Sequence, residues 1–182
     1  MPRKTKKKKE KLPNQLINIS NADKKWHEKW YRNRNPLNIP HPYRAVVCGK
    51  PNSGKSTVIK NLLVRAKPAF KQVIIIHCDP ENTKEYDDLG EATQITGDIP
   101  SPSDFEPDEK TMVVIDDLEI KRLPKEQMIN LDRLFGYVST HKNVSVLITA
   151  QECFSLPPIV RRCANLWILW KIDDMDALQM IT

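Results

Sequence analysis

Short apolar runs alternate with amphipathic stretches along most of the chain beyond residue 43. The apolar runs are rich in β-branched residues, which is typical of buried strands in a parallel sheet. We predict strands at 45–48, 73–77, 112–116, 144–149 and 166–170, and a weaker one at 93–96. Helices are predicted at 55–67 and at about 125–140, because apolar side chains recur there on one helical face. This alternation predicts one α/β domain with a central, mostly parallel sheet flanked by helices.

The positive charge of the chain is concentrated at its N-terminus. Residues 1–13 hold seven of the 29 Lys and Arg residues and one of the 23 acidic ones, so the remainder carries 22 of each. Like charges repel and this arm has almost nothing apolar to bury, so we expect it to be disordered. A solubilising tail, a nuclear-localisation signal and a phosphate-binding arm are all consistent with it.

The remaining chain divides into an extension and a domain. Residues 14–42 form an N-terminal extension and linker, in which a short helix at 21–32 would place Trp26 and Trp30 on one face. These indoles would pack on the domain or stack on bases. The domain itself is expected at 43–182, and its last ten residues resemble the first turns of a helix that breaks off, as in a truncated piece of a longer protein.

Cysteine usage and hydropathy bear on the environment of the protein. The four cysteines lie far apart without a CxxC pair, which favours reduced and mostly buried thiols over disulfides or a zinc site. No run of about 18 apolar residues occurs, so neither a membrane-spanning helix nor a signal peptide is predicted. We therefore expect a soluble, intracellular protein without a membrane partner.

The segment GKPNSGKS, residues 49–56, matches the phosphate-binding pattern G-x-x-x-x-G-K-[ST] between a predicted strand and a predicted helix. Glycines let the main chain curl so that several amides point inward, with the positive helix N-terminus behind them. Lys55 would reach the β- and γ-phosphates of ATP, and the Ser56 hydroxyl would bind Mg²⁺. The expected nucleotide-binding residues are Gly49, Lys50, Pro51, Asn52, Ser53, Gly54, Lys55, Ser56 and Thr57.

A pair of acids follows the predicted strand MVVID. Asp116 is expected on the Mg²⁺ side, and Asp117 would orient or deprotonate the attacking water, with Glu119 as a fallback. An acid pair that only caps a turn is the alternative interpretation. Lys55 and Asp116 are 61 positions apart, which leaves room for a strand and helix between the two motifs. This spacing favours the ASCE-type, RecA-like branch of P-loop NTPases, in which an extra strand separates the two motif strands.

Other sequence features refine the class. A GTPase is disfavoured because the guanine-reading NKxD pattern is missing. Gln151 follows the strand at 144–149 and would lie at the edge where ligands bind in such sheets. It would sense the γ-phosphate there, or it is an ordinary loop glutamine.

The order GKPNSGKS, VVIDDL, THKNVSVLITAQ and LPPIVRRCANLWILW resembles the genome-packaging ATPases of large DNA viruses, including poxvirus-type enzymes, and of virophages. These ATPases belong to the FtsK–HerA superfamily, and the resemblance covers about residues 43–182. It implies that Gln151 links nucleotide state to movement, and that a homo-oligomeric ring, a pentamer or hexamer, surrounds double-stranded DNA. It also implies an arginine finger from the neighbouring subunit. Relatives often have Arg at the position where this chain has Thr140, so the finger must lie elsewhere. The candidates are Arg161, Arg162, Arg133 and Lys142, and we expect Arg161. The alternative is that Arg161 and Arg162 are ordinary surface charges.

The function that the resemblance implies is hydrolysis of Mg²⁺-ATP to drive double-stranded DNA into a viral capsid, with the capsid or procapsid vertex as partner. The protein would act in the host cytoplasm, at the virus factory, or in the virion, and the basic arm leaves the nucleus open. Two other classes remain: another P-loop NTPase, such as a DNA helicase or a nucleotide kinase, and a non-enzymatic nucleotide-binding protein.

Overall fold

The computed structural model describes residue 39 and residues 41–170. The predictions made for the basic arm at 1–13, for the helix carrying Trp26 and Trp30, and for the start of a helix at 173–182 lie outside the described residues. The division into arm, extension and domain therefore remains a prediction.

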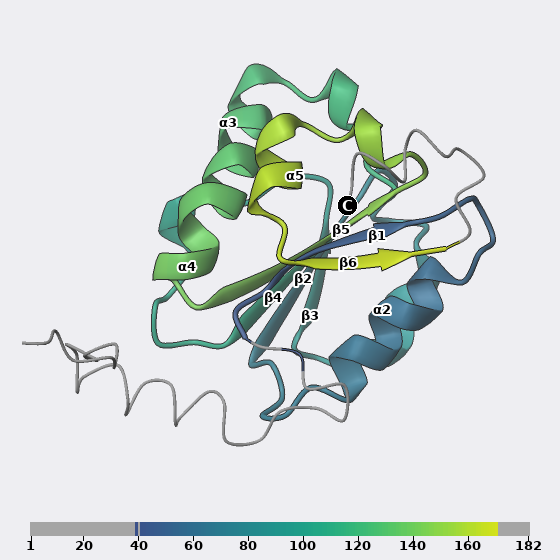
Figure 1. The fold of residues 1–182 in the computed structure, drawn as a ribbon. Helices are drawn as coiled ribbons and strands as arrows, with labels where there is room; N and C mark the ends of the chain where they lie inside the picture. The colour runs from purple at the N-terminus through teal and green to yellow at the C-terminus, as the bar shows by residue number, and fades with distance from the viewer. Residues whose placement is uncertain (1–38, 40, 171–182) are drawn as a thin grey trace, which may run out of the picture.

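Six parallel strands form one sheet in the order β3-β2-β4-β5-β1-β6 (Figure 1). The six predicted strands all form, with ends that shift by one residue at most. They are β1 (Arg44–Cys48), β2 (Gln72–His77), β3 (Thr93–Thr96), β4 (Thr111–Asp116), β5 (Val144–Ala150) and β6 (Leu166–Leu169). The prediction of an α/β domain with a parallel sheet is confirmed.

Short helical segments connect the strands. They are α2 (Lys55–Val64), η1 (Lys84–Leu89), η2 (Pro102–Asp104), η3 (Ile120–Arg122), α3 (Lys125–Arg133), η4 (Leu134–Val138), α4 (Ser139–His141), η5 (Cys153–Ser155) and α5 (Pro158–Cys163). Two of the helix predictions need correction. The helix predicted to end at residue 67 stops at Val64, and Pro68, which disfavours helical backbone before it, lies a few residues further on. The helix predicted at 125–140 is interrupted by a π-helical turn, η4, before it ends at His141.

The sheet is buried on both faces, because successive side chains of each strand point to opposite sides. On one face, Val46, Ile115 and Ile148 pack with apolar residues of α3, η4 and α5. On the other face, strand residues such as Val47 and Val114 pack with α2 and η1. The domain therefore has three layers, with α2 on one side of the sheet and α3, α4 and α5 on the other (Figure 1). None of the helices in the described part of the chain has the length and apolar character needed to cross a bilayer.

The four cysteines are all free thiols, as predicted. Cys48 and Cys153 are buried, and burial together with the neighbouring Cys48 raises the pKa of the Cys153 thiol to about 12. Cys78, however, is exposed and Cys163 is only partly buried. The expectation of mostly buried thiols thus holds for two of the four, because Cys78 follows the end of β2 instead of lying within the strand.

Strand order determines which loops meet. β5 lies between β1 and β4, so the predicted extra strand between the phosphate loop and the acid pair is present. Because the strands are parallel and in register at their ends, Cys48 lies opposite Ala150, and His77 lies opposite Asp116. The loops that follow β1, β2, β4 and β5 therefore open at the same edge of the sheet.

Candidate active site

The loop between β1 and α2 curls tightly. Asn52 and Gly54 both have left-handed backbone, with φ of 58° and 90°, and Gly54 directly precedes the first residue of α2. Glycine adopts this conformation without steric cost. The Lys55 ammonium donates hydrogen bonds to the carbonyls of Gly49 and Lys50, each over 3.0 Å. The loop thus holds a cation against its own main chain at the N-terminus of a ten-residue helix, which is the arrangement that binds phosphate.

Two further observations test whether this loop fits a phosphate group. A Cβ atom on Gly49 would lie 2.7 Å from the Ser53 hydroxyl oxygen and 3.2 Å from Trp170, so no larger residue fits there without movement. The Ser53 hydroxyl is itself buried and has no hydrogen-bond partner among the described residues. A buried polar group of this kind is costly unless something bonds to it. The residues present therefore fit a bound polyphosphate.

Asp116 is the buried acid of the site. Its carboxylate sits at the end of β4, and the residue is 5% exposed. The Thr149 hydroxyl donates to Oδ1 over 2.7 Å, and the Tyr86 hydroxyl donates to Oδ2. The Ser56 side chain lies close to the Tyr86 hydroxyl. A carboxylate has about four lone-pair sites, so Asp116 retains capacity for a metal-bound water.

Asp117 differs from its neighbour in conformation and exposure. It is exposed, and its φ of 50° places it in the left-handed region that non-glycine residues rarely adopt. Its amide donates to the Thr149 hydroxyl over 3.1 Å. Such strain persists only where surrounding contacts hold it, and it clusters at functional sites. Thr149 therefore fixes both acids at once, through the carboxylate of one and the main chain of the other.

Two adjoining cavities of about 560 Å³ and 520 Å³ open around Lys55. The first is lined by most of the predicted nucleotide-binding residues and both acids: Pro51, Asn52, Gly54, Lys55, Ser56, Thr57, Asp116 and Asp117. The second extends along the loops after β4 and β5 and includes Glu119. Gln151 is exposed and lines both cavities. The structure thus brings the predicted phosphate loop, acids and glutamine into one region.

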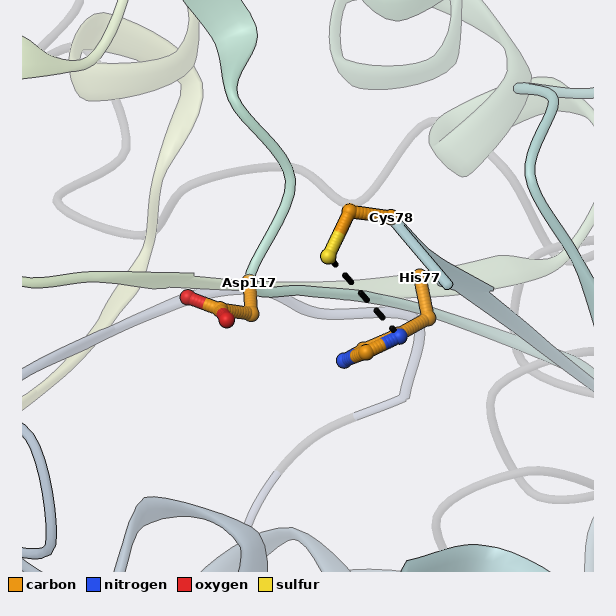
Figure 2. Close-up of side chains that lie close together, drawn as sticks. All are labelled: His77, Cys78 and Asp117. Atoms are coloured by element: carbon orange, nitrogen blue, oxygen red, sulfur yellow. Dashed lines mark hydrogen bonds between the residues drawn. The ribbon is translucent and has the colours of Figure 1, made fainter. Parts of the chain in front are cut away.

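Two sets of side chains could hold a cation. Ser56 and Asp116 offer oxygen atoms, which Mg²⁺ prefers. His77, Cys78 and Asp117 form a second set, whose ligand atoms lie within 4.8 Å of one another (Figure 2). Its mixture of nitrogen, sulfur and oxygen suits a softer ion such as Zn²⁺ and not Mg²⁺. In addition, the Asp79 amide donates to His77 Nδ1 over 3.0 Å, so this histidine already has a structural role in closing the turn after β2.

Arg161 is not among the residues that line the two cavities around Lys55. It is partly buried on α5, where its Nε donates to the Leu156 carbonyl over 3.2 Å and its guanidinium lies over the Phe154 ring. Arg162 is exposed, and its Nε donates to the Pro158 carbonyl. The sequence-predicted arginine is therefore held by its own segment, outside the site of its own chain.

Sequence reasoning missed Tyr86 and Thr149. Thr149 had a signal, because it ends a predicted strand next to Gln151 at the edge where ligands bind. Tyr86 had none, since it lies in η1, a short 3₁₀ helix in a polar segment without apolar periodicity.

Comparison with known proteins gives a likeness of fold. No family model matches the sequence, and a comparison with curated proteins finds no match either. Among solved structures, the genome-packaging NTPase B204 of Sulfolobus turreted icosahedral virus 2 in complex with AMPPCP has a TM-score of 0.58 at 20% identity, over 79% of this chain and 82% of that chain. Its complex with AMP gives a TM-score of 0.60 at 18% identity, over 79% and 82%. The cytoplasmic domain of EssC gives 0.59 at 15% identity, over 84% of this chain and 34% of that longer chain. The described part of this chain therefore has the fold of these proteins, in agreement with the resemblance that its motifs carry.

Proposed function

We propose that this protein is an ATPase that hydrolyses Mg²⁺-ATP to move double-stranded DNA into a viral capsid. The observation that supports it most is the meeting of three loops at one sheet edge: the phosphate loop after β1, the acid pair after β4 and Gln151 after the intervening β5. In-line attack of water on the γ-phosphorus needs a phosphate cradle, a cation and a group that orients the water.

The residues divide this chemistry among them. The loop amides and Lys55 would bind the phosphates, and Ser56 with Asp116 would hold the Mg²⁺, which neutralises phosphate charge when bound. Asp117 would orient or deprotonate the water, because its carboxylate is exposed at the shared edge of the two cavities. Gln151 lines both cavities and would sense whether the γ-phosphate is present.

The DNA-packaging part of the proposal draws on the fold likeness and the motif resemblance together. The neighbour B204 is described as a genome-packaging NTPase and was crystallised with AMPPCP and with ATP-gammaS. By analogy, this chain would assemble as a homo-oligomeric ring around duplex DNA and dock at a capsid vertex. It would work in the host cytoplasm or in the virion. The basic arm at 1–13 would contribute contacts to DNA phosphates.

Arg161 is our candidate for the residue that enters the site of a neighbouring subunit. Its position outside its own site is compatible with that role, and an arginine finger in related enzymes raises turnover by about 10³–10⁵. Mixing Arg161→Ala protein with Lys55→Ala protein tests this proposal. Turnover should reappear in the mixture, because one partner supplies the intact site and the other supplies the arginine. Two inactive proteins that stay inactive when mixed would contradict it.

The experiment that tests the function is an ATPase assay with and without duplex DNA, at several salt concentrations. We expect duplex DNA to stimulate turnover, and the stimulation to weaken with salt because phosphate contacts release counterions. Deleting residues 1–13 should flatten the salt dependence. Phosphate transfer to a small acceptor without DNA stimulation would instead identify a nucleotide kinase. Nucleotide binding without turnover in any condition would identify a non-enzymatic protein.

A further inference from the structure

A buried tyrosine lies between the two groups proposed to hold the cation. Tyr86 is 1% exposed, and its ring packs in the apolar layer between the sheet and α2. Its hydroxyl donates to Asp116 Oδ2, and the Ser56 side chain lies close to the same hydroxyl. The Tyr86 hydroxyl thus lies between the acid after β4 and the phosphate loop, although Tyr86 belongs to neither motif.

The hydrogen bonds in this connection have a direction. An ionised carboxylate only accepts, so the tyrosine proton points to Asp116. The lone pairs of the tyrosine oxygen are then available to the nearby Ser56 hydroxyl, and a Ser56 proton directed there would leave the serine lone pairs for another partner. The Thr149 hydroxyl holds the other carboxylate oxygen of Asp116 over 2.7 Å. Asp116 is therefore held at both carboxylate oxygens by neutral donors, and it keeps lone pairs for a cation or its bound water.

Tyr86 is itself held in place by its surroundings. Its segment, η1, packs against α2, where Lys60 pairs with Asp88 over 2.9 Å. That ion pair is largely exposed, so it contributes little stability, but it joins η1 to the helix that begins with the phosphate-binding lysine. Burial, and then the adjacent Asp116 carboxylate, raise the pKa of the Tyr86 hydroxyl. A tyrosine hydroxyl is protonated at physiological pH in any case, so it is a donor to Asp116 there.

We propose that Tyr86 is a positioning residue for the active-site cation, which it serves by holding Ser56 and Asp116 in the arrangement that binds Mg²⁺. The inference rests on the proposed function, because it concerns the cation of that same site. Tyr86 does not line either cavity around Lys55, so it would act through the two residues proposed to bind the metal. Outer-shell partners of this kind change metal affinity or activity by about 10–100-fold when they are replaced.

The variant that tests this is Tyr86→Phe, which keeps the buried ring and removes only the hydroxyl. Binding of Mn²⁺ in place of Mg²⁺ is measured by electron paramagnetic resonance in the presence of saturating ADP. Affinity for ADP is measured separately in EDTA, where the cation makes no contribution. Tyr43→Phe is the matched control, because Tyr43 is also a buried tyrosine, 4% exposed, but precedes β1 at the opposite edge of the sheet.

We expect Tyr86→Phe to weaken Mn²⁺ binding by about 10–100-fold and to leave ADP affinity in EDTA unchanged, while Tyr43→Phe changes neither. Equal loss of ADP affinity with and without the cation would indicate a general packing defect and overturn the inference. Unchanged Mn²⁺ binding in Tyr86→Phe would also overturn it, with the proposed function intact. A wild-type protein that binds no nucleotide in either condition would overturn the proposed function, and this inference with it.

Discussion

Thr149 is a small residue on which both acids of the site depend. Its hydroxyl donates to Asp116 Oδ1 over 2.7 Å and accepts the Asp117 amide over 3.1 Å. Thr149→Val keeps the shape of the side chain and the β-branched character that suits a strand, and it removes only the hydroxyl. The variant should therefore separate the hydrogen bonds from the packing.

The magnitude follows from the two bonds. A hydrogen bond to a charged group contributes about 1.5–3 kcal/mol, and one between neutral groups about 0.5–1.5 kcal/mol. We expect Thr149→Val to lower the free energy of unfolding by about 2–4 kcal/mol, which a domain of ordinary stability survives. Because Asp117 also loses the contact that holds its left-handed backbone, turnover should fall by about 10–100-fold, as for other outer-shell residues.

Urea denaturation gives the first quantity and an ATPase assay gives the second. Thr96→Val is the control, since Thr96 also lies near the carboxyl end of a strand and its hydroxyl accepts a hydrogen bond from the Asp98 amide over 3.3 Å, but no carboxylate is involved. The control should lose less than about 1.5 kcal/mol and keep full turnover. If Thr149→Val matches that control in both assays, the Thr149 hydroxyl does not hold the two acids in place.

Three further changes test other parts of the account. Asp117→Asn should keep ATP affinity but lose turnover by about 10²–10⁴, measured by titration calorimetry and phosphate release; unaltered turnover would exclude this acid. Gly49→Ala places a Cβ 2.7 Å from the Ser53 hydroxyl oxygen. It should weaken ATP binding by roughly 1–3 kcal/mol, the usual cost of overpacking. ATP affinity equal to that of the wild type would show that the loop accommodates the methyl group without cost. Burial, and then the charge of Lys110, lower the pKa of His41 to about 3. Between about pH 3 and 6.5 the unfolded state therefore binds a proton on His41 that the folded state does not bind. The free energy of unfolding should rise with pH across that window. Denaturation at pH 5.5 and 7.5 should show a loss of about 1 kcal/mol on acidification that His41→Gln reduces; equal losses in the two proteins would contradict it.

The strands could be predicted because the physics that forms them is local. Runs such as the one from Val73 to Ile76 are buried on both faces of a parallel sheet, so they appear in the sequence as uninterrupted apolar segments. The phosphate loop was also visible, since its glycines and Lys55 must occur at fixed spacing. Asp116 could be found because it directly ends an apolar run that predicts a buried strand.

The rest depended on contacts between distant segments. Tyr86 reaches Asp116 from 30 positions away, out of a 3₁₀ segment whose polar sequence predicts no element. The π-helical turn in the predicted 125–140 helix likewise leaves no mark, because its apolar residues have the spacing of an α-helix. Arg161 lies outside the site because of where α5 packs. The adjacent pair Arg161 and Arg162 does not by itself reveal that position. These are tertiary effects that override local preference.

The central claim is that the loop at 49–56, in which Lys55 is the first residue of α2, binds a triphosphate. Lys55→Ala tests it most directly, with Lys125→Ala as the control, because Lys125 is the exposed first residue of α3 and has no phosphate loop before it. ATP affinity measured by calorimetry should fall by at least about tenfold in Lys55→Ala, the loss of charge-assisted hydrogen bonds of about 1.5–3 kcal/mol, and stay at the wild-type value in Lys125→Ala. Equal ATP affinity in both variants and the wild type would contradict the account.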